Sequence, residues 1–124
     1  MAWYELAMNP SAISSLYVEV PPLQSVRIRE LTLEHTGNVL VSIDLPELPN
    51  RVPIRWRRQT YVTMYLQLQL FHVQQLHLSG WLGSNPVDLS ISKENQKYFI
   101  SSLNTASGYN FQCVLDAFRI NWIK

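Results

Sequence analysis

The chain is poor in cysteine, glycine and charge. Among its 124 residues there are one cysteine and four glycines, and only 15% of the residues are Asp, Glu, Lys or Arg. The lone Cys113 excludes a fold held together by disulfides within the chain. Ten basic and nine acidic residues give a formal net charge of +1, which supplies no general attraction to phosphate. We therefore expect no non-specific binding of nucleic acid.

Long apolar runs are also missing. No stretch approaches the roughly 18 apolar residues that a membrane-spanning helix requires. Residues 1–10 include Glu5 and no basic residue, so they do not match a secretory signal peptide. Nevertheless 47% of the residues are hydrophobic, with 4 Trp, 6 Tyr and 4 Phe, which favours a folded chain over a disordered one. We expect one soluble cytoplasmic domain over residues 1–124, without membrane contact.

The apolar pattern changes from helical to alternating early in the chain. Asn9 predicts the N-cap of a short helix, with Pro10 as its first residue, and the prolines at 21 and 22 predict that it has ended. Beyond them, apolar and polar residues alternate in about eight segments, the longest over residues 60–72. Such alternation with period two is typical of half-buried strands.

One predicted strand changes phase along its length. Val26 and Ile28 fall on one face of this strand, whereas Leu31 and Leu33 fall on the other. A β-bulge near residues 29–30 is the simplest explanation, because one extra residue returns both pairs to the same face.

The sequence therefore predicts a mainly β fold, an antiparallel sandwich or partly closed barrel of about eight strands. The short N-terminal helix would plug one end or lie on one sheet. The alternative is an α+β fold with one curved antiparallel sheet. Prolines at 46, 49 and 53 exclude a central strand over residues 46–59, so a long loop is expected there.

Residue types that carry catalysis or bind metals are sparse. His35, His72 and His77 are not accompanied by a second pair of ligands at metal-binding spacing. Cys113 lies in an apolar alternation without a basic neighbour, so we expect a buried and unreactive thiol. The sequence also lacks a glycine-rich phosphate loop, a nucleophile elbow and an acidic calcium loop. We predict no enzyme activity, no cofactor and no metal, unless His72, His77 and an acid converge in the fold.

The first candidate binding site is a cluster of four arginines and a tryptophan on the proline-rich loop: Arg51, Arg55, Trp56, Arg57 and Arg58. Arg and Trp are the residues most enriched in binding hot spots, so the cluster predicts a docking surface for an acidic partner. Single-stranded nucleic acid stacked on the tryptophan is a weaker alternative, because one aromatic makes a narrow groove. The cluster could equally be a solvated loop whose tryptophan packs into the core and whose arginines pair with nearby carboxylates.

Two other aromatic features are candidates. Trp81 lies in the turn 79–83, where it would either anchor a partner or fold back over the open end of a sheet. The polar face of the strand 60–72 mixes aromatics with amides, namely Tyr61, Tyr65, Gln67, Gln69 and Phe71. This face could line a ligand cavity or meet a partner, but an amphipathic outer face is the default interpretation.

The order of several short motifs resembles the immunity protein 50 family of bacterial polymorphic toxin systems. The motifs are Trp3-Tyr4-Glu5-Leu6, Asn9-Pro10, Ser15-Leu16-Tyr17, Val20-Pro21-Pro22-Leu23, Ile43-Asp44-Leu45-Pro46, Pro53, Trp56, Leu78-Ser79-Gly80-Trp81 and Asp88-Leu89. The resemblance implies a small cytoplasmic protein that binds and neutralises a cognate toxin domain, protecting the producing cell. Such binding requires no catalytic residue, and no toxin-binding residue can be transferred from the family.

The net charge of the chain limits which kind of toxin is expected. Immunity proteins that occlude the basic active site of a nuclease are often strongly acidic, whereas this chain carries a net charge of +1. We therefore hypothesise that the 51–58 loop docks on an acidic patch of the toxin. The alternative function is a small-ligand-binding β-barrel or sandwich lined by Tyr61, Tyr65 and Phe71. A third possibility is a structural subunit with homotypic contacts, and the sequence leaves the oligomeric state open.

Overall fold

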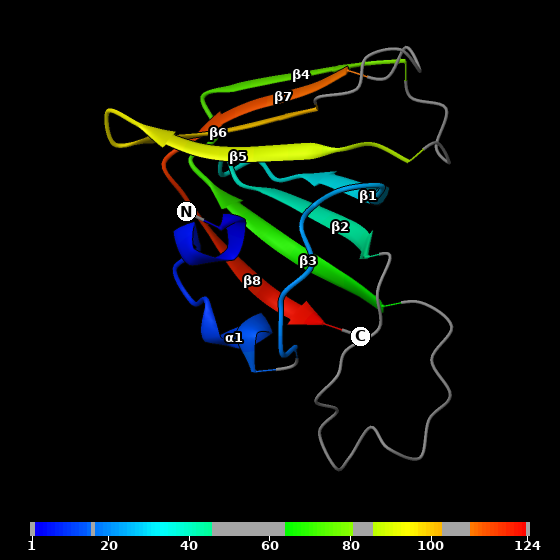
Figure 1. Ribbon diagram of the computed structural model, residues 1–124. Helices are drawn as coiled ribbons and strands as arrows, with labels where there is room; N and C mark the ends of the chain where they lie inside the picture. Colours follow the sequence, from blue (N-terminus) through cyan, green and yellow to red (C-terminus); the bar gives the residue numbers. More distant parts are fainter. Residues whose placement is uncertain (1, 16, 46–63, 81–85, 103–109, 124) are drawn as a thin grey trace.

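The computed structural model describes residues 2–15, 17–45, 64–80, 86–102 and 110–123, and the structural statements below concern these residues. The eight strands are β1 Arg27–Leu33, β2 Val39–Leu45, β3 Met64–Phe71, β4 Gln75–Ser79, β5 Leu89–Glu94, β6 Lys97–Ser102, β7 Asn110–Leu115 and β8 Ala117–Ile123. They form two four-stranded antiparallel sheets, with the orders β1-β2-β3-β8 and β4-β7-β6-β5 (Figure 1).

The two sheets share a corner at which two strands pass from one sheet to the other. β3 leads into β4 through His72, which has a φ of 51°, and β7 leads into β8 through Asp116. Antiparallel hydrogen bonding continues around this corner, because the Asp116 N–H donates to the Phe71 carbonyl over 3.0 Å. The Gln74 N–H likewise donates to the Val114 carbonyl over 2.8 Å. One bent two-stranded ribbon thus joins the sheets.

The inward faces of both sheets fill one apolar core. Its buried side chains include Ile43 of β2, Leu68 of β3 and Phe111 of β7. Phe118 of β8 meets Tyr98 of β6 edge to face, with ring centroids 5.9 Å apart, so an aromatic pair joins the two sheets. The predicted mainly β, sandwich-like fold is confirmed. The described strands form two sheets and no closed barrel, so the alternative of an α+β fold with one curved sheet is wrong.

Several local predictions are confirmed. The pairing of β1 with β2 shifts register between Ile28 and Glu30, which is the predicted bulge. Gly37, at the predicted hairpin turn between these strands, has a φ of 90°, a value that glycine adopts without a steric penalty. Within β3, the alternating Leu66, Leu68 and Leu70 are all buried. Residues 60–63 of the predicted long strand lie outside the described ranges.

The N-terminal segment lies beside β8 of the first sheet and β5 of the second sheet. It contains a 3-10 helix, η1 (Trp3–Leu6), and a single-turn helix, α1 (Ser11–Ser14), which lies beside β8 (Figure 1). The predicted role of Asn9 as a helix cap is wrong, since Pro10 is the N-cap and no side chain caps the helix. The Asn9 amide instead bonds to Ile120, because the edge of β8 offers it a donor and an acceptor together.

Candidate functional site

The outer face of the second sheet is the best candidate site in the described part of the chain. Leu76 and Leu78 of β4 point toward the core, so Gln75, His77 and Ser79 point outward. The same alternation holds in the neighbouring strand. Gln112 of β7 lies opposite His77 and therefore also points outward. We call the group Gln75, His77, Phe99, Ser101, Gln112 and Val114 the β4-β7-β6 face.

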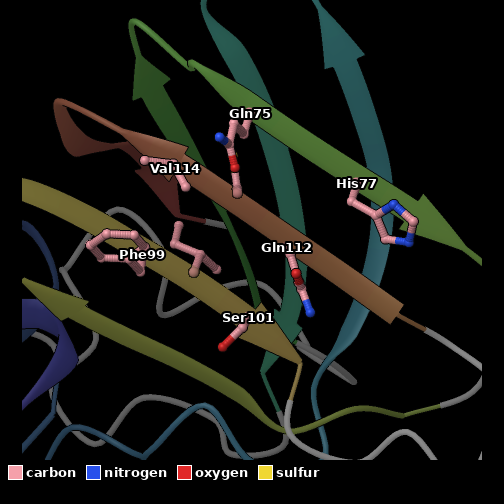
Figure 2. A pocket seen from close by; sticks show the side chains of 8 residues that line it. Gln75, His77, Phe99, Ser101, Gln112 and Val114 are labelled. Carbon is pink, nitrogen blue, oxygen red and sulfur yellow. The ribbon is translucent and has the colours of Figure 1, made fainter.

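A hollow of about 190 Å³ lies on the β4-β7-β6 face. Figure 2 shows Gln75 and His77 projecting from β4, Gln112 and Val114 from β7, and Phe99 and Ser101 from β6, all on one side of the sheet. Pockets for drug-sized small molecules have volumes of roughly 300–1,000 Å³. The hollow is therefore closer to the size of one side chain from a partner than to that of a cofactor.

The hollow is lined without charge. The amides of Gln75 and Gln112, the His77 ring and the Ser101 hydroxyl can each donate and accept hydrogen bonds, while Phe99 and Val114 are apolar. These groups suit recognition of a neutral polar or apolar surface. Depletion of charge with retained hydrogen bonding is also what distinguishes the centre of a protein–protein interface from ordinary surface.

Charged groups gather instead at the corner between the sheets. Asp116 accepts hydrogen bonds from Lys97, from Gln74 Nε2 over 3.2 Å and from His72 Nδ1 over 3.3 Å. The hydrogen bond from Lys97 and its charge, assisted by His72 and Gln74, lower the pKa of Asp116 against an opposing effect of desolvation. The cluster joins β6 to the bend of the ribbon, which gives it a clear structural role.

The described ranges contain neither a metal-binding cluster nor a reactive thiol. No group of three or more His, Cys, Asp or Glu residues there is arranged to hold a metal ion. Cys113 is buried, as predicted, and burial raises the pKa of its thiol to about 11. A thiol in this state is a poor nucleophile at neutral pH.

Comparison with known proteins identifies the family. The sequence profile of immunity protein 50 matches residues 9–124, nearly the whole chain. The chain belongs to the immunity protein 50 family. Neither the curated proteins nor the solved structures provide a match. Within the described residues, none of the helices has the length and apolar character needed to cross a membrane.

The binding residues predicted for this immunity protein 50 family member are not among those that the structure describes. Arg51, Arg55, Trp56, Arg57 and Arg58 all belong to the range 46–63, and Trp81 belongs to the range 81–85, so both predictions lie outside the described residues.

The polar face of β3 is described in part. Gln67, Gln69 and Phe71 are half-buried and lie on the side opposite the buried leucines, which makes this the outer face of the first sheet. Gln67 also accepts a hydrogen bond from Asn121 of β8 over 3.1 Å. The structure therefore places these three residues on an outer face, where the default interpretation expects them.

Sequence reasoning missed the hollow on the second sheet. Its lining comes from three segments, near residues 75–77, 99–101 and 112–114, that become neighbours only when β7 pairs between β4 and β6. A signal was nevertheless present, because Gln75, His77 and Gln112 occupy outward positions at which Lys or Glu would be usual.

Proposed function

We propose that this protein, acting as a single domain in the bacterial cytoplasm, binds the toxic domain of a polymorphic toxin and neutralises it. Its membership of the immunity protein 50 family supports an immunity role with a protein toxin as the general kind of partner. Neutralisation by occlusion requires a stable scaffold and a specific surface but no reacting group. A non-enzymatic role is therefore part of the proposal.

The observation that carries the proposal at the level of residues is the neutral hollow on the β4-β7-β6 face. Its six outward side chains sit on paired strands, so their positions are set by backbone hydrogen bonds rather than by a loop. We propose that one apolar or neutral polar side chain of the toxin enters the hollow and hydrogen-bonds with Gln75, His77 or Gln112. The surrounding serines, Ser90 and Ser92 of β5, would form the solvated rim.

The test is co-expression of this protein with the C-terminal domain of the toxin encoded beside it. We expect restored growth and a co-purifying complex. Gln112→Arg would fill the hollow with a long charged side chain and should weaken toxin binding at least about tenfold, or about 1.4 kcal/mol. Thr32→Arg is the matched control, because Thr32 is an exposed strand residue of the other sheet. Normal binding by Gln112→Arg, or a failure of the unaltered protein to protect, would contradict the proposal.

The arginine cluster is the second candidate surface for the same toxin. Arg51, Arg55, Arg57 and Arg58 surround Trp56 in the sequence, and Trp81 offers a further aromatic anchor. Their composition supports docking on an acidic patch. A small-ligand-binding role has weaker support, because the described hollow is smaller than pockets that bury a drug-sized ligand.

A further inference from the structure

Three of the four outer sheet edges are covered or charged. At the edge of β8, the Met8 N–H donates to the Phe118 carbonyl over 2.9 Å. The Asn9 side chain donates to the Ile120 carbonyl and accepts from the Ile120 N–H. At the start of β5, the N–H of Leu89 donates to the carbonyl of Leu23 over 2.8 Å. The remaining strand of this group, β1, carries charged residues and a bulge. Natural sheets use these devices to prevent pairing with another chain.

The fourth edge, β4, has none of these devices. Its residues Gln75–Ser79 include no charged residue, no proline and no glycine, and its ladder with β7 has no register shift. Among the described residues, only β7 pairs with β4, which lies at the outer limit of the second sheet in Figure 1. Within the described residues, its second row of backbone N–H and carbonyl groups has no partner strand, which is the condition for pairing with another extended strand.

We propose that a second copy of this chain pairs with β4 through its own β4, in an antiparallel register centred on His77. In this register each His77 lies opposite the same residue of the second copy. Gln75 lies opposite Ser79, and Leu76 lies opposite Leu78. The two chains then share one continuous eight-stranded sheet.

The pattern of β4 favours a second copy over a different strand. Polar residues at 75, 77 and 79 alternate with Leu76 and Leu78, so the pattern is unchanged when the strand direction is reversed. Self-pairing therefore places leucines against leucines on the core side and neutral polar groups against each other on the outer side. The contact is isologous and closes after two copies, whereas pairing with the charged β1 edge of another copy would not close.

The proposed dimer leaves the β4-β7-β6 face open. A two-fold axis that passes between the two paired His77 residues, normal to the sheet, puts both hollows on the same side of the shared sheet. The inference does not depend on the proposed function, since self-association can be measured without any toxin.

The experiment measures the mass of the purified full chain by sedimentation equilibrium, from about 1 µM to about 1 mM, the range over which small specific interfaces associate. We expect the mass to rise toward twice the chain mass of 14.4 kDa. Gln75→Lys/Ser79→Lys places two pairs of like charges across the proposed interface and should keep the protein monomeric. Gln75→Lys/Ser79→Glu places opposite charges at the same positions and should restore the dimer.

Gln112→Lys is the matched control, because Gln112 is also outward-facing and exposed but lies one strand in from the edge. It should remain dimeric, and circular dichroism should show that every variant is folded. His77→Cys should form a disulfide between two copies under mild oxidation, since paired residues in antiparallel strands have Cα atoms about 4.5–5.5 Å apart. A monomeric unaltered protein, or a Lys/Lys variant that still dimerises, would overturn the proposal, and a monomeric Lys/Glu variant would overturn the register.

Discussion

Asn9 binds the backbone of Ile120 as a neighbouring strand would. Its Nδ2 donates to the Ile120 carbonyl over 2.7 Å, and the Ile120 N–H donates to its Oδ1 over 2.8 Å. The two residues are 111 positions apart in the sequence. One side chain thus satisfies both backbone groups at the edge of β8 and ties the start of the chain to its last strand.

Asn9→Ala should therefore destabilise the protein by about 1–3 kcal/mol, because it leaves a part-buried donor and acceptor without partners. The measurement is urea denaturation followed by tryptophan fluorescence. Asn121→Ala is the control, since Asn121 makes one exposed hydrogen bond to Gln67 and its loss should cost about 0.5 kcal/mol or less. Equal effects of the two substitutions would contradict the assigned role of Asn9.

The aromatic contact between the sheets leads to a second prediction. Phe118 is fully buried and packs edge to face on Tyr98, so Phe118→Ala would open a cavity where the sheets meet. We expect a loss of about 3–5 kcal/mol of stability in chemical denaturation, typical of a buried Phe-to-Ala change. Leu33→Ala should change stability by less than about 0.5 kcal/mol, because Leu33 is 64% exposed. A small effect of Phe118→Ala would show that the two sheets do not depend on this contact.

The elements of this fold were more predictable than their arrangement. The alternation of apolar and polar residues over 64–71 predicts a strand, and Gly37 predicts a turn. Both signals come from residues that are close together in the sequence. The bulge at residues 28–30 was also predictable from the sequence, because the apolar alternation changes phase there and a bulge is the simplest cause of such a change. By contrast, the pairing of β4 with β7 joins segments more than 30 residues apart, and nothing local specifies it. The hollow depends on that pairing, so its residues could not be grouped from the sequence.

Asn9 is a single-residue example of a long-range contact that the local sequence does not predict. An asparagine before a proline at the start of a helix is a good local capping signal. The strand edge at Ile120 offers two hydrogen bonds rather than one, and tertiary contact overrides the local preference.

The charge pair at the corner predicts a stability that depends on pH. Lys97 lowers the pKa of Asp116 in the folded protein, so the ionised carboxylate stabilises the fold above the pKa of an unfolded aspartate, about 3.9. This contribution is lost as the pH falls through the lower, folded pKa. Asp116→Asn should therefore be less stable than the unaltered protein at pH 7, and the difference should shrink below about pH 4. Urea midpoints measured from neutral to acidic pH check this expectation.

Lys97→Met supplies the control for that measurement. It should lower the stability of the protein that retains Asp116 but have a smaller effect in the Asp116→Asn background, because the pair is then already broken. Additive effects of the two substitutions would mean that Lys97 and Asp116 act independently.

Cys113 gives a prediction about reactivity. Burial raises the pKa of its thiol from 9.0 to about 11, and the side chain is enclosed by β7 and its neighbours. A higher pKa lowers the fraction of reactive thiolate at neutral pH. A thiol-specific chromogenic reagent should therefore react slowly with the native protein and promptly with one equivalent after unfolding in urea. Rapid reaction in the native state would show that Cys113 is accessible.

Salt dependence can separate the two candidate toxin-binding surfaces. If the arginine cluster docks on an acidic patch, Arg55→Ala/Arg57→Ala/Arg58→Ala should slow association and reduce its dependence on ionic strength, because screened charges steer the encounter. Gln112→Arg should act mainly on dissociation, since the neutral hollow contributes close contacts rather than long-range attraction. Association and dissociation rates of each variant, measured at low and at physiological salt, distinguish these two effects. An unchanged rate and salt dependence in the triple alanine variant would leave the hollow as the supported surface.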